Sequence, residues 1–116
     1  NPDVELWTPH PTRDFNYVED IVNAFLKAAA NELEFEIFNI GSNIETRIGD
    51  MVDMIRQITG KDVNITYKEP EDGTVTSNRL RCDNSKAVKH LGWKPQFSFK
   101  EGLEKTVHWY KEHSSI

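Results

Sequence analysis

The residues able to do acid–base, thiol or metal chemistry are scattered along this sequence and form no catalytic set. Four histidines and the single Cys82 are the ligands that zinc would favour. His108 and His113 are five residues apart, so they would not share one face of a helix, and Cys82 has no second cysteine to join it. Its neighbours Arg81 and Asp83 could tune the thiol, but no base is near in sequence. The pattern therefore predicts no metal site and an ordinary structural cysteine.

Two acidic residues, Asp14 and Asp20, could be imagined as a paired acid site. Carboxylates at turns and at helix starts are stabilising by themselves, because they accept backbone hydrogen bonds and face the positive end of the helix dipole. We therefore expect Asp14 and Asp20 to hold a turn and cap a helix. His10 lies in a proline-rich turn and is expected to be exposed to solvent.

Two signatures of cofactor-dependent catalysis are missing from residues 1–116. The six glycines never fall at the G-x-x-G-x-x-G spacing of a phosphate-binding turn. None of the three tyrosines is followed four places later by the lysine of a Y-x-x-x-K proton-transfer pair; the residues there are Ile21, Glu71 and Ser114. We expect no cofactor site in this chain and no turnover from it alone.

The hydrophobic pattern of the first half predicts two short strands, a helix and a buried strand. Residues 4–7 and 15–18 suit short strands, which could pair as a hairpin around the turn at residues 8–12. From residue 19 the period becomes helical, and Asn31 is expected to end that helix. Residues 35–40 then form a dense β-prone run, which is typical of a buried strand.

The second half begins with a predicted helix and strand. Thr46 is a suitable N-cap for a helix whose apolar residues recur at a spacing of three and four, and Gly60 is expected to end it. Residues 63–67 alternate between apolar and polar and predict a half-buried strand. The polar residues 68–78 predict an exposed loop.

Two further helices are predicted near the end of the chain. Asp83 or Asn84 is expected to cap a short helix that Gly92 stops. Ser98 and Glu101 have the spacing of a capping box, in which each side chain satisfies a backbone amide near the other residue. The sum is an α/β fold of about four helices with two or three short strands.

Composition limits the classes of protein. The 116 residues suit one domain, and 37% hydrophobic with 28% charged residues does not suggest disorder. The net charge of −5 argues against nucleic-acid binding, and no apolar run is long enough to cross a bilayer. A single cysteine fits a reducing compartment, so we expect a cytoplasmic location. The first residues have no initiator Met, basic region or apolar segment, and predict a domain boundary rather than a signal peptide.

Four motifs occur in one order along most of the chain. R-D-F-x-Y-V-x-D begins at Arg13, F-N-I-G-S at Phe38, R-x-x-x-D-N-S-K-A at Arg79 and L-G-W-K-P at Leu91, with E-G-L following at Glu101. Together they resemble the carboxy-terminal third of the extended short-chain dehydrogenase/reductases. That family contains the NAD-dependent nucleotide-sugar epimerases and 4,6-dehydratases, dTDP-glucose 4,6-dehydratase among them. Its members usually have a glycine-containing turn before R-D-F, whereas residues 8–12 here hold two prolines and no glycine.

The resemblance implies that residues 1–116 are a substrate-binding domain without the Rossmann domain that binds NAD. In the family this segment completes the nucleotide-sugar pocket and packs against that domain, which carries the catalytic tyrosine, lysine and serine or threonine. The reaction implied for a whole enzyme is hydride transfer from the sugar's C4 to NAD, a change at the keto intermediate, and hydride return. NAD is thus implied for a full-length enzyme and not for this chain.

The resemblance also implies three substrate-binding residues. Arg13 and Arg79 lie roughly where related enzymes place arginines on the nucleotide's phosphates or sugar, and guanidinium groups bind phosphate bidentately. The alternative is that they are ordinary surface arginines, as Arg81 is expected to be. Asn43 lies near an asparagine that contacts the nucleotide in related dehydratases, although asparagine also suits a left-handed turn. Trp93 is expected to be a core anchor.

Two functional hypotheses follow. The first is the nucleotide-sugar-binding portion of an NAD-dependent dehydratase or epimerase, which is not catalytic alone. The second is a stand-alone, non-catalytic binding or self-association module derived from such an enzyme, since the predicted helices carry wide apolar stripes for so small a sheet. Trp109 and Tyr110 would then belong either to the core or to an interface with the missing domain. The motifs do not distinguish epimerase from dehydratase, nor one sugar or nucleobase from another.

Overall fold

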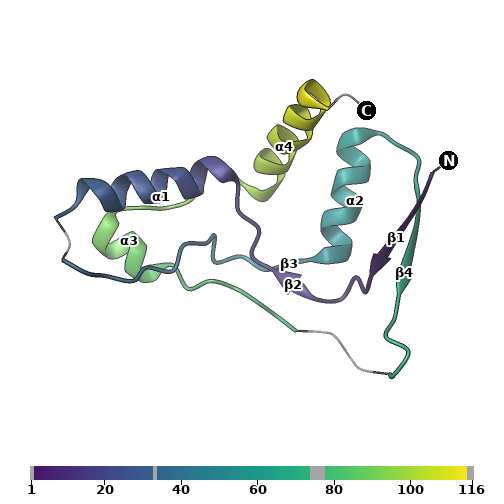
Figure 1. The fold of residues 1–116 in the computed structure, drawn as a ribbon, viewed down its shortest axis with the longest axis horizontal. Helices are drawn as coiled ribbons and strands as arrows, with labels where there is room; N and C mark the ends of the chain where they lie inside the picture. The colour runs from purple at the N-terminus through teal and green to yellow at the C-terminus, as the bar shows by residue number, and fades with distance from the viewer. Residues whose placement is uncertain (1, 33, 74–77, 115–116) are drawn as a thin grey trace.

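The computed structural model describes residues 2–32, 34–73 and 78–114 and confirms the α/β prediction (Figure 1). In chain order the elements are β1 (Asp3–Trp7), β2 (Thr12–Arg13), α1 (Val18–Ala30), β3 (Thr46–Arg47), α2 (Ile48–Thr59), β4 (Asn64–Lys68), α3 (Ser85–Leu91) and α4 (Phe99–His113). The molecule is elongated, with extents of 53 × 39 × 20 Å. Helices α1 and α3 lie together at one end, and β1 and β4 lie at the other (Figure 1).

Strand β1 does not form the hairpin that the sequence suggested. It pairs in parallel with β4, so that Val4 lies opposite Ile65 and Leu6 opposite Tyr67. Residues 15–17 are not a strand, and α1 begins at Val18. Parallel strands need a long crossover, and here it contains α1 and α2. The predicted alternation in β4 is confirmed, because Ile65 and Tyr67 are half-buried between exposed neighbours.

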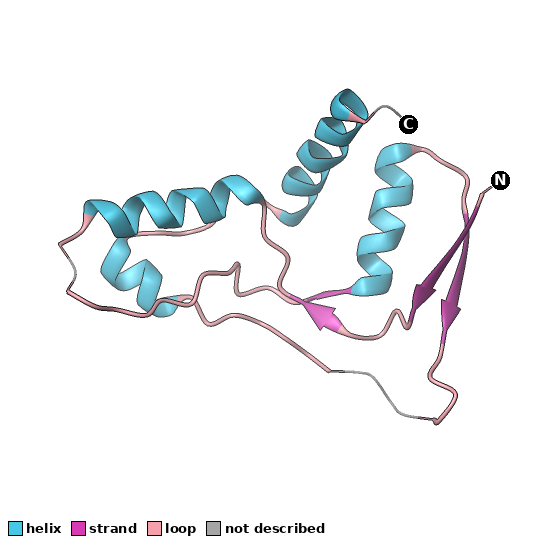
Figure 2. Ribbon diagram, in the orientation of Figure 1, coloured by secondary structure: helices cyan, strands magenta, loops and turns pink. Residues whose placement is uncertain are grey.

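Residues 35–40 are not the buried strand that their composition predicted. The segment is a loop (Figure 2), and none of the described strands pairs with it. Phe38 and Ile40 pack against the core, whereas Phe35 is 83% exposed and Ile37 68% exposed. A strand requires a neighbouring strand to bond its backbone, and an apolar pattern by itself cannot supply one.

The two shortest strands, β2 and β3, form a junction in the middle of the molecule (Figure 1). β2 and β3 pair antiparallel, and Thr12 of β2 also forms a parallel bridge with Arg79. The prediction of Thr46 as N-cap of α2 is wrong, because Thr46 belongs to β3 and Arg47 precedes the helix without a side-chain cap. The first two amides of α2 donate instead to the carbonyls of Pro11 and Pro9, at 3.0 and 3.1 Å.

The core forms where α1 and α3 meet Trp93, which is 1% exposed, as the sequence predicted. The indole Nε1 donates to the Asp20 carbonyl at 2.9 Å. The prediction that Asp20 caps α1 is wrong. Its buried carboxylate accepts the backbone amides of Gln96 at 2.8 Å and Phe97 at 3.4 Å. Asp20 is only 1% exposed, and a buried carboxylate requires hydrogen-bond donors such as these two amides.

Most helix boundaries agree with the sequence. Asn31 ends α1, and Gly60 and Gly92 end α2 and α3 with φ angles of 65° and 64°. The Ser98–Glu101 capping box of α4 is present. Of the two expected caps of α3, Asn84 makes no side-chain hydrogen bond to the helix start, whereas the Asp83 carboxylate accepts the Ser85 amide at 3.0 Å. The predicted loop at residues 68–78 falls partly on residues 74–77, which lie outside the described part of the chain.

Gly102 allows α4 to approach Tyr17 closely. A methyl group at position 102 would lie 2.8 Å from the Tyr17 Cβ. That atom is attached to the backbone, so it cannot move away unless the backbone moves with it. Gly→Ala in a helix interior usually stabilises by about 1 kcal/mol. We predict that Gly102→Ala instead lowers the free energy of unfolding by about 1–3 kcal/mol, because a crowded site must be distorted. Urea denaturation measures this, with Glu104→Ala as a nearby exposed control within about 0.5 kcal/mol of the parent. An alanine variant as stable as the parent would contradict the contact.

Candidate functional site

The loops around the central junction converge on the carboxylate of Asp14. Its Oδ1 accepts the Ser42 amide at 2.9 Å and the Ser42 hydroxyl at 2.5 Å. Its Oδ2 accepts the amides of Asn43 at 2.9 Å and Cys82 at 3.0 Å. Gly41 is required beside it, because a Cβ at that position would lie 2.4 Å from the Cys82 Cβ. One side chain thus joins three segments that are far apart in sequence, and the expectation that Asp14 holds a turn is confirmed.

The hydrogen bonds to Asp14 keep it ionised. Burial raises the pKa of this carboxyl, but the Ser42 hydroxyl and the backbone amides of Cys82, Ser42 and Asn43 outweigh burial, so the net pKa lies below its ordinary value. Cys82 shows the opposite effect. Burial first, and then the charges of Asp14 and Asp83, raise the pKa of its thiol. A reactive thiolate is therefore disfavoured, in agreement with the structural role expected for Cys82.

Arg79 lies beside β2 and is held by Glu45. Its Nε donates to one Glu45 oxygen at 2.6 Å and its Nη2 donates to the other at 2.9 Å. The Thr12 hydroxyl donates to the same carboxylate at 3.3 Å. The Arg79 hydrogen bond is the main reason why the pKa of Glu45 lies below its ordinary value. No local pattern predicts this pair, because the two residues are 34 positions apart.

Arg13 lies on β2, next to the bridge between Thr12 and Arg79, but contacts different groups. Its Nη1 donates to the Thr12 carbonyl at 2.7 Å and to the Asn78 Oδ1 at 3.1 Å. Thr12 and Arg79 both contact Glu45, whereas Arg13 contacts Asn78, the residue next to Arg79 in sequence. The structure therefore places Arg13 on β2 and Arg79 on the segment that bridges to Thr12, and gives each arginine its own partners.

Asn43 adopts the left-handed backbone conformation, with a φ of 64°. This agrees with the turn chemistry expected of asparagine. Its backbone amide donates to Asp14. The residue is exposed and precedes Glu45 by two positions. A ligand role for Asn43 stays a prediction.

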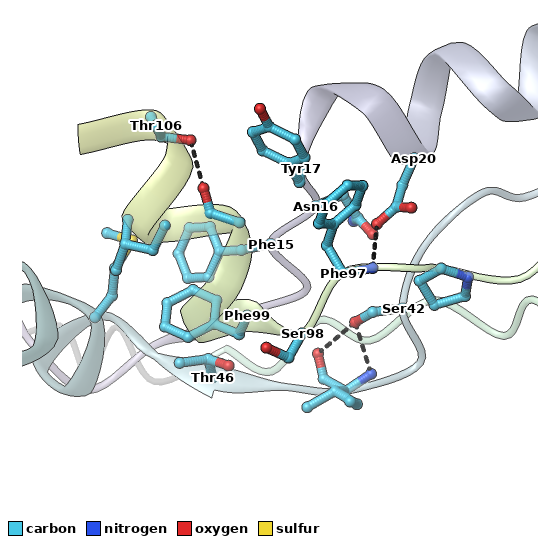
Figure 3. Close-up of a pocket in the computed structure, with 15 residues that line it drawn as sticks. Phe15, Asn16, Tyr17, Asp20, Ser42, Thr46, Phe97, Ser98, Phe99 and Thr106 are labelled. Carbon is cyan, nitrogen blue, oxygen red and sulfur yellow. Dashed lines mark hydrogen bonds between the residues drawn. The ribbon is translucent and has the colours of Figure 1, made fainter. Parts of the chain in front are cut away.

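An apolar cleft of about 190 Å³ lies between α2, α4 and the loops that follow β2 and precede β3 (Figure 3). Aromatic rings from distant segments pair along it: Phe15 with Phe99 at 5.7 Å between centroids, and Tyr17 with Phe97 at 4.9 Å. Neither predicted arginine lines this cleft, nor does Asn43. Phe15 is two residues from Arg13, so the cleft begins close to one of them.

The remaining candidate residues lie outside this cleft. Trp109 and Tyr110 are more than half exposed, so they are not core residues. His10 is exposed, as expected. Within the described residues, no group of three or more histidine, cysteine or acidic side chains could hold a metal ion, and no helix is long and apolar enough to cross a membrane.

Comparison with known proteins identifies the family. The family model described as GDP-mannose 4,6 dehydratase matches residues 3–106. The chain belongs to this family. It is 38% identical to a putative UDP-glucose 4-epimerase of Methanocaldococcus jannaschii over 89% of its own length and 32% of that protein. It is 30% identical to the dTDP-D-glucose 4,6-dehydratase of Bos taurus over 88% of its length and 30% of that protein.

Solved structures of the family share the fold. The UDP-glucose 4-epimerase of Thermotoga maritima, crystallised with UDP-glucose, has a TM-score of 0.83 and 33% identity over 95% of this chain and 35% of that one. The dTDP-glucose 4,6-dehydratase of Bacillus anthracis, in complex with NAD, also has a TM-score of 0.83, with 25% identity over 97% of this chain and 35% of that one. The chain thus spans about a third of the length of the relatives it matches, and corresponds to the carboxy-terminal part of an extended short-chain dehydrogenase/reductase.

The Asp14 network generates a stability prediction. Because the folded state lowers the pKa of Asp14 below the unfolded value of about 3.9, the stabilisation is present above about pH 4 and is lost as the pH falls through the folded-state pKa. We predict that Asp14→Asn lowers the free energy of unfolding at pH 7 by about 2–4 kcal/mol, because the amide offers only one acceptor oxygen to these donors. Urea denaturation between pH 3 and 7 measures both effects.

The exposed Asp50, which pairs with Arg47 on the surface, supplies the control. Asp50→Asn should change stability by less than about 1 kcal/mol, since exposed ion pairs contribute little. Equal losses for the two variants, or a parent chain whose stability falls no more steeply in acid than that of Asp14→Asn, would refute the proposed importance of Asp14.

Proposed function

We propose that this chain is the nucleotide-sugar-binding portion of an NAD-dependent nucleotide-sugar dehydratase or epimerase, and that residues 1–116 form one substrate-binding domain. The observation that carries the proposal is the family match across residues 3–106. It is supported by relatives named as UDP-glucose 4-epimerases and dTDP-D-glucose 4,6-dehydratases, which differ in sugar chemistry but share a nucleoside diphosphate in their substrates.

The central junction carries the groups suited to a diphosphate. Arg13 lies on β2, Arg79 forms a bridge with Thr12 of the same strand, and Asn43, two residues before Glu45, donates its amide to Asp14. Guanidinium groups stay charged at all physiological pH values and bind phosphate oxygens in pairs. Their backbone is fixed by the β2 pairing and by Asp14, so we propose that Arg13, Asn43 and Arg79 contact the nucleotide. No residue in this part of the chain is proposed as catalytic.

The described residues do not fit NAD. Dinucleotide binding uses a strand, a glycine-rich turn and a helix N-terminus with free amides aimed at the pyrophosphate. The first amides of α2 already donate to Pro11 and Pro9, and α4 is closed by its capping box. Gly49, the glycine at the start of α2, is buried against Pro9. We therefore derive no catalytic step through NAD from these residues.

Exposed apolar residues favour one alternative, a non-catalytic module that associates with itself. Phe25 on α1 is 72% exposed, and Phe35 and Ile37 are also mostly exposed to solvent. Such surface usually becomes covered by a partner. Size-exclusion chromatography with light scattering separates the two hypotheses. A stable dimer would favour the module, and a monomer that aggregates would favour part of a larger enzyme.

We predict that NAD binds this chain no more tightly than about 1 mM, the weak end of the usual affinity scale. The physical reason is that the glycine-rich turn is missing from residues 1–116, and that the first amides of α2 and the capped start of α4 are already bonded. Isothermal titration calorimetry of the purified chain with NAD measures this. A dissociation constant in the micromolar range would overturn it.

We also predict weak binding of UDP or TDP, followed by NMR titration. The affinity should be low, because these residues cover only part of the ligand and the site is therefore less buried and less preorganised. Charge-assisted hydrogen bonds contribute roughly 1.5–3 kcal/mol each, so Arg13→Ala and Arg79→Ala should each weaken binding about ten-fold or more. The effect should shrink at high salt, since exposed charges are screened.

Arg56→Ala provides a matched control, because Arg56 is exposed near the end of α2 and is not at the junction. It should leave the affinity unchanged. If the parent chain binds UDP and neither Arg13→Ala nor Arg79→Ala alters the affinity, the assignment of these two arginines is wrong.

A further inference from the structure

The Glu45–Arg79 pair has an asymmetry that bears on ligand binding. The Glu45 side chain is only 19% exposed and is also bound by the Thr12 hydroxyl, whereas the Arg79 side chain is 78% exposed. The carboxylate is thus fixed by the fold, and the guanidinium is the accessible member. Both Glu45 oxygens are used, one on Nε and one on Nη2 of Arg79.

A carboxylate and a phosphate compete for the same edge of a guanidinium group. Each presents two oxygens at the spacing of the parallel N–H donors, so each binds Arg in the same bidentate geometry. With Glu45 on the Nε–Nη2 edge, Arg79 offers an incoming phosphate only its remaining N–H groups. A phosphate that binds through the Nε–Nη2 edge therefore requires Arg79 to release Glu45 first.

We propose that Glu45 is a tethered competitor that lowers the affinity of Arg79 for a phosphate group. The proposal rests on the proposed function, in which Arg79 contacts the diphosphate. Glu45 keeps favourable partners when Arg79 releases it, because the Thr12 hydroxyl remains bound and Arg81 is near enough to lower the pKa of Glu45. The release therefore requires little free energy, and the pair reduces the affinity for a phosphate without abolishing binding.

The size of the effect follows from the exposure of the pair. While Arg79 is bound to Glu45, its Nε–Nη2 edge is closed to a phosphate. The apparent dissociation constant for the phosphate therefore equals the intrinsic one divided by the fraction of molecules in which this edge is free. Ion pairs with an exposed member shift an equilibrium by about two- to five-fold. Glu45→Gln should therefore tighten UDP binding by about two- to five-fold, since a neutral amide binds guanidinium more weakly than a carboxylate does.

The test is an NMR titration of UDP into the parent chain, Glu45→Gln, Arg79→Ala and the double variant. Glu36→Gln is the matched control, because it removes one negative charge from another ion pair, that of Glu36 with Lys86. We expect tighter binding only for Glu45→Gln, and no effect of Glu45→Gln in the Arg79→Ala background. The Arg79 Nε–H resonance of the parent should shift on UDP addition as its partner changes.

The outcomes distinguish this proposal from the proposed function. If the parent binds UDP and Arg79→Ala weakens binding, but Glu45→Gln binds no more tightly than Glu36→Gln, the competitor is refuted while the nucleotide site stands. Equal tightening by Glu45→Gln with and without Arg79 would show a general charge effect and would also refute it. No UDP-induced shift in the parent or in Glu45→Gln would overturn both.

Discussion

The central part of this protein depends on one carboxylate. Asp14 bonds backbone amides from the Gly41–Ser42–Asn43 turn and from Cys82, and therefore fixes the relative positions of loops that no regular sheet connects. A two-residue strand pair such as β2–β3 has too few hydrogen bonds to persist alone. The ionised acid supplies what the short ladder lacks, because charge-assisted hydrogen bonds are about twice as strong as neutral ones.

A second carboxylate plays the same part at the start of α1. Asp20 accepts two amides after Trp93, and its carbonyl accepts the indole of Trp93 itself. This small chain therefore uses one buried and one half-buried acid to connect distant segments, while the apolar core of the described residues consists of little more than Trp93 and a few aliphatic residues. The arrangement gives precise backbone positions at the junction and leaves the neighbouring arginine side chains accessible to a ligand.

The exposed apolar surface is understandable from the family comparison. The chain spans about a third of the length of its relatives, and side chains such as Phe25 and Phe35 are exposed in the structure. A domain of this size buries a smaller share of its surface than a whole enzyme does. The polar junction and the apolar surface therefore have different origins: hydrogen bonding fixes the first within this chain, whereas nothing in residues 2–32, 34–73 and 78–114 covers the second.

The sequence by itself determined the helices, the caps at Gly60, Gly92 and Ser98, strand β4 and the family, because periodicity, caps and short motifs are local. Only the tertiary structure decided that β1 pairs with β4, that residues 35–40 are a loop, and that Asp20 bonds the chain after Trp93. It also decided that Glu45 holds Arg79. These features depend on which distant backbone groups come within hydrogen-bonding reach, and spacing along the chain contains no record of that.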